Sequence, residues 1–191
     1  MPPQFQDHLI PKEITAFLID RQAQKRSPRT IEFYSDKLNH FSAWLAANDL
    51  TRMDQITPDH VRQYLVDYSQ THNAGGCHAA YRAIKAFLRW FGAETDEPDY
   101  RSPMRNVKPP KVKTDPLPGV PLGDIQAMLA ACPRTFLGAR DRAILYALLD
   151  TGLRKSEFTS LNYGHVDLRT GAVKVISGKG DKDRTVFLGP K

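Results

Sequence analysis

Seven prolines within residues 97–121 constrain the fold of this 191-residue chain more than any other feature. Proline lacks a backbone N–H and clashes with the preceding helical turn, so no continuous helix can run through this stretch. An extended, basic linker is therefore expected over residues 98–121. It divides the chain into an N-terminal region, residues 1–97, and a C-terminal region, residues 122–191.

The N-terminal region repeats apolar residues at the three- and four-residue spacing of amphipathic helices. A first helix is expected over residues 9–25. Ser27-Pro28 and Thr57-Pro58 each place an N-cap residue before a first-turn proline, which predicts two further helix starts. We interpret Gly75-Gly76 as the break before a fourth helix. These signals together predict a bundle of four helices joined by short loops.

The C-terminal region changes its period partway along. Helical spacing gives way to alternation, with turn-forming segments between the alternating runs. Helices are expected over residues 124–131, 139–150 and 153–161, and strands over residues 166–168, 172–176 and 185–188. Helices that lead into a small antiparallel sheet are an α+β pattern, so the whole chain is predicted to be mainly α with an α+β second half.

Two segments of this region carry the most informative chemistry, TGLRKSE at residues 151–157 and GKGDKDR at residues 178–184. Arg154 follows a helix-ending glycine and opens the next helix, where free backbone N–H groups favour an anion. A guanidinium there can bind two phosphate oxygens in a bidentate manner. Glu157 lies one turn later, and its spacing fits either a carboxylate that orients Arg154 or an ordinary ion pair on the helix surface.

Lys179 stands between two glycines at the expected tip of a hairpin. The segment is not a phosphate-binding P-loop, because the GxxxxGK[ST] pattern is absent. A lysine on a mobile hairpin suits proton donation to an oxygen leaving a phosphodiester, and a basic turn without a chemical role is the alternative. Asp181 and Asp183 alternate with Lys182 and Arg184, which indicates charge balance within the turn and no metal site.

Basic residues gather in two further places. On the fourth helix, residues at spacings of four, three and four share one face and form a basic stripe, His78, Arg82, Lys85 and Arg89. A solvated helix face and a phosphate-contacting helix are both compatible with it. Residues 101–113 carry five bases and no acid. Among them Arg105, Lys108 and Lys111 either follow a phosphate backbone or serve as a solubilising tether.

Composition limits the classes of function. No run reaches the 18 or more apolar residues of a membrane span, and the N-terminus lacks the pattern of a secretory signal, so we expect a cytoplasmic protein without a membrane partner. Cys77 and Cys132 are isolated thiols that fit a reducing compartment. The net charge of +6 is compatible with a polyanionic partner and does not require one.

The order of these parts resembles the tyrosine recombinase (phage integrase) family across essentially the whole chain. The resemblance implies that residues 1–97 are a SAM-like core-binding domain and that residues 122–191 are the N-terminal part of the catalytic domain. Arg154 then matches the first catalytic arginine, Lys179 the catalytic lysine and Glu157 the acidic residue that supports the site. Double-stranded DNA is the implied partner, with homo-oligomers on DNA for a full-length form. No metal, nucleotide cofactor or small-molecule substrate is implied.

Other parts of the family's pattern have no match in these 191 residues, namely the His-x-x-Arg box, the later His or Trp and the nucleophilic Tyr. Since catalytic residues act as a unit, we expect a truncated, DNA-binding recombinase chain that does not cleave and rejoin strands alone. Two alternatives remain open: a non-catalytic DNA-binding regulator or decoy, and a helical protein-interaction module.

Overall fold

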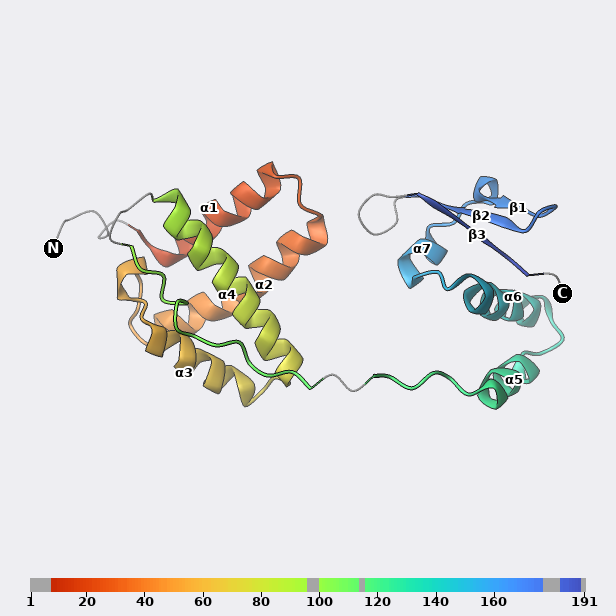
Figure 1. Cartoon of the computed structure of the whole chain (residues 1–191), viewed down its shortest axis with the longest axis horizontal. Coiled ribbons are helices and arrows are strands. Elements are labelled where there is room, and N and C mark those ends of the chain that lie inside the picture. The colour runs from red at the N-terminus through yellow and green to blue at the C-terminus, as the bar shows by residue number, and fades with distance from the viewer. Residues whose placement is uncertain (1–7, 96–99, 114–115, 177–182, 190–191) are drawn as a thin grey trace. The chain divides into compact units, whose positions relative to one another are not determined.

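The computed structural model describes residues 8–95, 100–113, 116–176 and 183–189. The chain forms two compact units, Met1–Asp115 (unit 1) and Pro116–Lys191 (unit 2), which are described separately below. Unit 1 contains α1 (Ile10–Ala23), α2 (Pro28–Ala47), the short 3-10 helix η2 (Met53–Gln55), α3 (Pro58–Ser69) and α4 (Ala74–Glu94) (Figure 1). In the described ranges, no helix is both long and apolar enough to cross a membrane.

The starts of α2 and α3 follow from the two capping signals in the sequence. The Ser27 hydroxyl accepts a hydrogen bond from the backbone N–H of Thr30 at 3.3 Å. The Thr57 hydroxyl accepts from the N–H of His60 at the same distance. Each cap satisfies one of the N–H groups that a helix start leaves unpaired. The expected helix starts are therefore confirmed.

The start of α4 differs from the expectation. The Asn73 side chain accepts a hydrogen bond from the N–H of Gly76 at 2.8 Å, so Asn73 is the cap and the helix begins at Ala74. Both glycines lie inside the first turn, and the prediction that Gly75-Gly76 breaks the chain before the helix is wrong. The cap and the long buried face of α4 outweigh the entropic cost of helical glycine, about 1 kcal/mol per residue.

The core of unit 1 is rich in aromatic residues. Phe17 of α1, Phe41 of α2, and Phe87 and Phe91 of α4 are all fully buried, and Tyr64 of α3 is 2% exposed. Phe17 meets Phe87 edge to face at 5.7 Å between ring centroids, and Phe41 meets Tyr64 in the same way at 4.9 Å. Every helix thus contributes a large side chain to one core, and the expected four-helix bundle is confirmed.

Residues 100–107, which we call the strap, also pack against unit 1. Met104 and Val107 are each 6% exposed and belong to its core. The ring of Tyr100 lies edge to face against Phe91 at 5.4 Å. The sequence placed these residues in an extended linker because its prolines forbid a continuous helix. The domain boundaries expected from the sequence stay a prediction, to which the structure adds this packed strap.

The described residues of unit 2 form three α-helices, a short 3-10 helix and a three-stranded sheet. Its elements are α5 (Leu122–Ala131), α6 (Phe136–Thr151), α7 (Lys155–Thr159), the 3-10 helix η3 (Tyr163–His165), β1 (Val166–Asp167), β2 (Ala172–Val175) and β3 (Arg184–Phe187). The strands pair antiparallel in the order β1-β2-β3, with Val173 opposite both Val166 and Val186. The small antiparallel sheet expected from the sequence is therefore confirmed.

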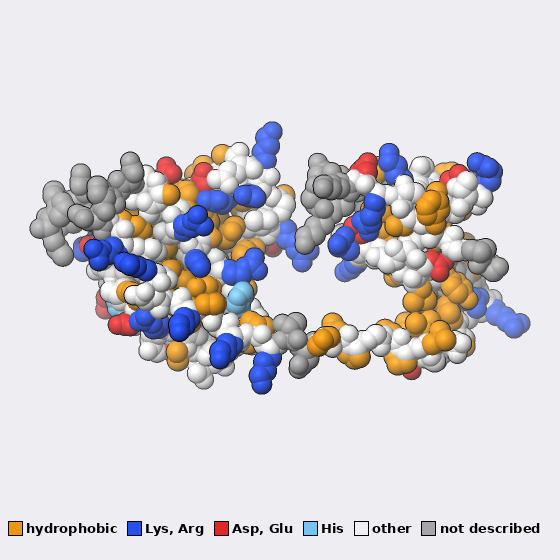
Figure 2. All heavy atoms as spheres, viewed as in Figure 1, with side chains coloured by type: hydrophobic (Ala, Val, Ile, Leu, Met, Phe, Trp, Pro, Cys, Tyr) orange, Lys and Arg blue, Asp and Glu red, His pale blue; other side chains and the backbone are white. Residues whose placement is uncertain are grey.

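The core of unit 2 is small. Leu153, Val173 and Val175 are its buried apolar residues, and partly buried side chains of α6, α7 and the sheet pack around them. No residue of α5 is buried. On the face visible in Figure 2, apolar side chains gather mainly over α5 and α6. The geometry of unit 2 therefore depends on its polar contacts more than that of unit 1 does.

The new position of Gly75 gives a test by substitution. Because Gly75 is helical and a Cβ there would meet only the Asn73 side chain at 3.4 Å, we expect Gly75→Ala to raise the free energy of unfolding of unit 1 by about 0.4–1 kcal/mol. Urea unfolding followed by the fluorescence of Trp44 and Trp90 measures this change. A destabilised Gly75→Ala variant would show that the glycines form a break after all.

Candidate functional site

The corner between α6 and α7 presents Arg154. Gly152 ends α6, as the sequence predicted, and does so in the left-handed conformation with φ of 59°. Leu153 is 7% exposed and anchors the corner in the core of unit 2. Arg154 follows as the N-cap residue of α7, and 58% of its side chain is exposed. The fold thus fixes the backbone of Arg154 and leaves its guanidinium on the surface.

Glu157 binds Arg154 through two groups. Its Oε2 accepts a hydrogen bond from the backbone N–H of Arg154 at 2.8 Å, and its Oε1 accepts one from Nη1 of the same residue at 2.9 Å. The Glu157 side chain is only 6% exposed. The ion pair with Arg154 is therefore present, but the Glu157 carboxylate is nearly buried and also binds the backbone of Arg154, which suits an orienting role.

Arg184 of β3 completes the arrangement. Its Nη1 donates to Oε1 of Glu157 and its Nη2 donates to Oε2, both at 2.8 Å. This parallel pair of bonds is the strong, geometrically specific form of an arginine–carboxylate contact. Glu157 therefore joins α7 to β3 and holds two guanidinium groups at once.

Sequence reasoning missed Arg184. It assigned this residue to charge balance with the neighbouring aspartates, whereas the structure pairs it with a carboxylate 27 positions away. The signal available in the sequence was its place in the same motif as Lys179. In the structure, Arg184 lies opposite the buried Val175 of β2. Spacing along the chain does not reveal such a long-range partner.

The two arginines set the charge state of Glu157. The hydrogen bonds from Arg184, and next the backbone N–H of Arg154, hold the pKa of the Glu157 carboxyl far below its ordinary value of 4.5. The same contact raises the pKa of the Arg184 guanidinium. Glu157 is therefore ionised throughout the physiological range, and among the described residues it is the only side chain that accepts a hydrogen bond from the Arg154 guanidinium.

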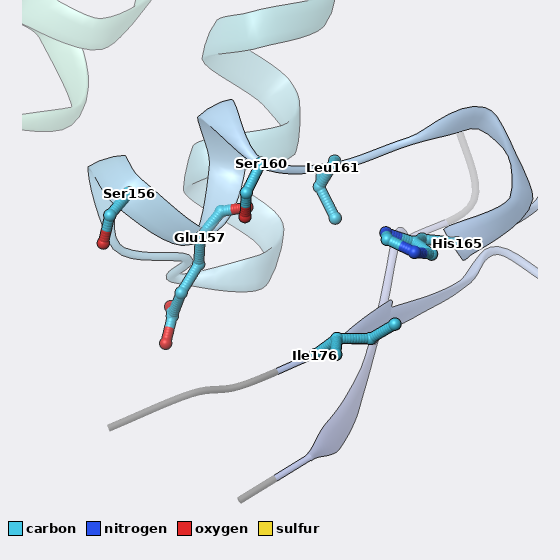
Figure 3. A pocket seen from close by; sticks show the side chains of 6 residues that line it. All are labelled: Ser156, Glu157, Ser160, Leu161, His165 and Ile176. Atoms are coloured by element: carbon cyan, nitrogen blue, oxygen red, sulfur yellow. The ribbon is translucent and has the colours of Figure 1, made fainter. Parts of the chain in front are cut away.

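A hollow of about 390 Å³ lies beside these groups. It is lined by Ser156, Glu157, Ser160, Leu161, His165 and Ile176 (Figure 3). Figure 3 shows the Glu157 side chain pointing away from α7, toward the strands β2 and β3. His165 was not among the predicted site residues. Its Nδ1 accepts a hydrogen bond from the N–H of Asn162 at 3.2 Å, which leaves Nε2 as the protonated ring nitrogen.

Lys179 lies outside the described residues. The strands on either side of its segment pair antiparallel, with Val175 opposite Arg184, which is the arrangement of a hairpin. Lys174 and Asp183 form an ion pair at 3.9 Å across these strands. Nowhere in the described ranges do three or more metal-ligating side chains cluster. The catalytic role of Lys179 stays a prediction.

The predicted DNA-contacting residues all lie at the surface of unit 1. On α4, Arg82, Lys85 and Arg89 are exposed and His78 is half-buried. Arg105, Lys108 and Lys111 of the following segment are exposed as well. Figure 2 shows Lys and Arg side chains spread over the visible face of this unit, with few acidic side chains among them. The α4 stripe and the basic residues that follow it thus both belong to unit 1, whereas Arg154 belongs to unit 2.

Two family models match the chain. "Phage integrase, N-terminal SAM-like domain" matches residues 14–95, and "Phage integrase family" matches residues 121–191. Among curated proteins, tyrosine recombinase XerC of Proteus mirabilis is 29% identical over 183 residues, which are 93% of this chain and 58% of that protein. Tyrosine recombinase XerD of Neisseria meningitidis serogroup B is 30% identical over 186 residues, 96% of this chain and 60% of that protein. The chain thus spans about three fifths of the length of these relatives.

Solved structures share the fold. A lambda integrase tetramer bound to a Holliday junction matches with a TM-score of 0.80 and 11% identity, over 98% of this chain and 51% of that one. The XerH site-specific recombinase bound to palindromic difH substrate matches with a TM-score of 0.65 and 19% identity, over 88% of this chain and 51% of that one. At these identities the likeness supports the fold alone.

The charge of Glu157 predicts a dependence of stability on pH. Its folded-state pKa is depressed, so its contacts stabilise unit 2 fully above pH 4.5 and progressively less as the pH falls below that value. We expect the wild-type chain to lose more thermal stability between pH 5 and pH 3 than Glu157→Gln does, with unfolding of β2 followed by NMR. Asp141→Asn, at an exposed ion pair, is the control and retains the wild-type dependence. Equal slopes for wild type and Glu157→Gln would contradict the assignment.

Proposed function

Because the chain belongs to the phage integrase (tyrosine recombinase) family, we propose that it binds duplex DNA and supplies part of a recombinase active site. The observation that carries this proposal is the paired arrangement at Glu157. One nearly buried carboxylate fixes Arg154 through its backbone and its guanidinium, while most of the Arg154 side chain stays exposed. A positively charged group held in advance is what a phosphate with growing negative charge requires.

Arg154 acts on the scissile phosphate in this proposal. Glu157 holds Nη1, and the remaining N–H groups of the guanidinium donate to non-bridging phosphate oxygens. Those oxygens gain charge as the phosphorus becomes pentavalent, so the interaction is stronger in the transition state than in the ground state. Arg184 acts through Glu157 and is a positioning residue, because its own guanidinium is engaged by that carboxylate.

Lys179 completes the proposed proton chemistry. Its ammonium donates a proton to the leaving 5′ oxygen as the bond between that oxygen and phosphorus breaks. Arg184 begins the strand that follows the Lys179 segment, so Glu157 ties the base of this hairpin to the helix that presents Arg154. The attacking nucleophile of the family is a tyrosine with no match in these 191 residues. We therefore propose that this chain alone does not cleave DNA.

Unit 1 supplies the proposed affinity for DNA. The exposed bases of the α4 stripe, together with Arg105, Lys108 and Lys111, are proposed to contact phosphates of the duplex and to place α4 at a groove. We place this activity in the cytoplasm, where the two free thiols, Cys77 and Cys132, stay reduced. Several copies on one DNA are proposed for a full-length form.

A regulator or decoy would use the same DNA-binding surface without the chemistry of unit 2. The exposed apolar residues of unit 2, among them Leu122 at 69% and Phe136 at 86%, favour a protein-interaction role as the second candidate. The two candidates differ in their response to salt, because only DNA binding releases many condensed counterions.

Salt dependence tests the proposed DNA binding. The association constant for a fluorescent 30-base-pair duplex is expected to fall steeply with salt, with a log–log slope of about −0.9 for each phosphate neutralised. Arg82→Ala and Arg89→Ala should each weaken binding and reduce the slope by about 1. Arg154→Ala should weaken binding less than either.

The matched control is Lys12→Ala, an exposed base at the start of α1, outside the stripe, which should bind as wild type. A flat salt response would contradict the proposal. Failure to bind DNA at low salt, together with stable binding of a protein, would favour the interaction module instead.

A further inference from the structure

The strap runs back along α4. At its first end, the Tyr100 hydroxyl donates a hydrogen bond to the backbone carbonyl of Leu88 at 3.2 Å. At its last end, the carbonyl of Val107 accepts one from the Tyr81 hydroxyl at 3.0 Å. The strap therefore advances from residue 100 to residue 107 while its contacts on α4 recede from Leu88 to Tyr81. It lies antiparallel to the helix, as its course beside α4 in Figure 1 shows.

Besides these hydrogen bonds, the strap packs tightly against α4 and is bonded to α3. A Cβ at Gly92 would lie 2.4 Å from Cε1 of Tyr100, so the ring of Tyr100 occupies the space that any larger residue at Gly92 would need. From α3, Nη2 of Arg62 donates to the carbonyl of Asn106 at 3.2 Å. Two helices thus fix the strap, and its conformation is part of unit 1.

The basic stripe lies directly beside the strap on α4. With 3.6 residues per turn, each residue advances about 100° around a helix. The strap contacts at Tyr81, Leu88 and Gly92 then fall on one line along the helix, within about 40° of one another. The stripe of His78, Arg82, Lys85 and Arg89 is centred about 70° farther round, on the adjacent line. The strap and the basic stripe therefore lie along adjacent lines of the α4 surface.

Tyr81 touches both. The ring of His78 lies 6.3 Å from the Tyr81 ring, in a stacked orientation, and the ammonium of Lys85 lies 5.8 Å from its centroid. The hydroxyl of the same residue, as described above, binds the strap at Val107. Tyr81 is itself 5% exposed, too little to be a main contact of a macromolecular partner. Its position suits a residue that organises the charged groups around it.

We infer that Tyr81 is a positioning residue of the DNA-binding surface. It holds Val107 and so places Lys108, the residue after the strap, beside the α4 stripe, and Lys108 and the stripe then bind one run of duplex phosphates. This inference rests on the DNA binding proposed above. A lysine on a fixed backbone loses less conformational entropy on binding than one on a loose tether, so its contact contributes more affinity.

The test uses Tyr81→Phe in the full chain. Phenylalanine keeps the ring next to His78 and Lys85 and removes only the hydroxyl that binds Val107. We expect the affinity for the duplex to fall about threefold to tenfold, the range set by one buried hydrogen bond. We also expect Lys108→Ala to weaken binding clearly in the wild-type chain and little in the Tyr81→Phe chain, because the lysine has already lost its position.

Lys113→Ala is the matched control, since this exposed base lies six positions beyond Val107, and its effect should be the same in both backgrounds. An equal effect of Lys108→Ala in both backgrounds would overturn the positioning role, even where Tyr81→Phe itself weakens binding. If the wild-type chain binds no duplex at low salt, the proposed DNA binding itself is contradicted. This result differs from one in which the wild-type chain binds DNA and only the positioning role of Tyr81 is overturned.

Gly92→Ala supplies a second route, because it displaces Tyr100 at the other end of the strap and leaves Tyr81 intact. If Tyr81→Phe disturbs the fold by circular dichroism, the cycle with Lys108→Ala is measured in Gly92→Ala instead. Because Tyr81 still holds Val107 in this variant, an undiminished Lys108 effect is the expected result, and loss of the effect would contradict the inference.

Discussion

A carboxylate that is removed from water must be paired, and unit 2 is organised around this requirement at Glu157. Among the described residues of this unit, three apolar side chains are buried, and partly buried side chains that include Phe158 of α7 and Val186 of β3 pack around them. The bonds of Glu157 to Arg154 and Arg184 add a direct constraint between α7 and β3. The same bonds leave one guanidinium exposed in a fixed orientation, so the structural constraint and the proposed chemistry arise from one side chain.

Unit 1 is stabilised in a different way. Its aromatic core draws on all four helices, and the strap adds Met104 and Val107 to that core as it runs back along α4. A rigid scaffold of this kind allows bases on separate segments to act as one surface, since neither the helix nor the strap must be ordered when a partner binds. The proposed division of labour follows from the packing: binding on the densely packed unit and phosphate chemistry on the lightly packed one.

Local signals in the sequence predicted most of the fold, and long-range contacts account for most of the features that were missed. Caps at Ser27 and Thr57 and the left-handed Gly152 are local devices and lie where expected. Gly75 was misread because its helical conformation depends on the Asn73 cap and on the buried face of α4. The strap and Arg184 went unrecognised because their partners, on α4 and at Glu157, are distant in the sequence. Lys179 and the DNA contacts stay predictions.

An NMR titration of the isotope-labelled chain with duplex DNA tests the central claim most directly. The account predicts that chemical shifts change in two places: at the α4 stripe with the strap and Lys108, and at the Nε–H of Arg154, whose guanidinium Glu157 binds through Nη1. Changes at the first place alone would support binding and leave the phosphate site unused by this duplex. Saturating DNA without a change at either place, or with changes confined to the exposed apolar residues of α5, would contradict the account.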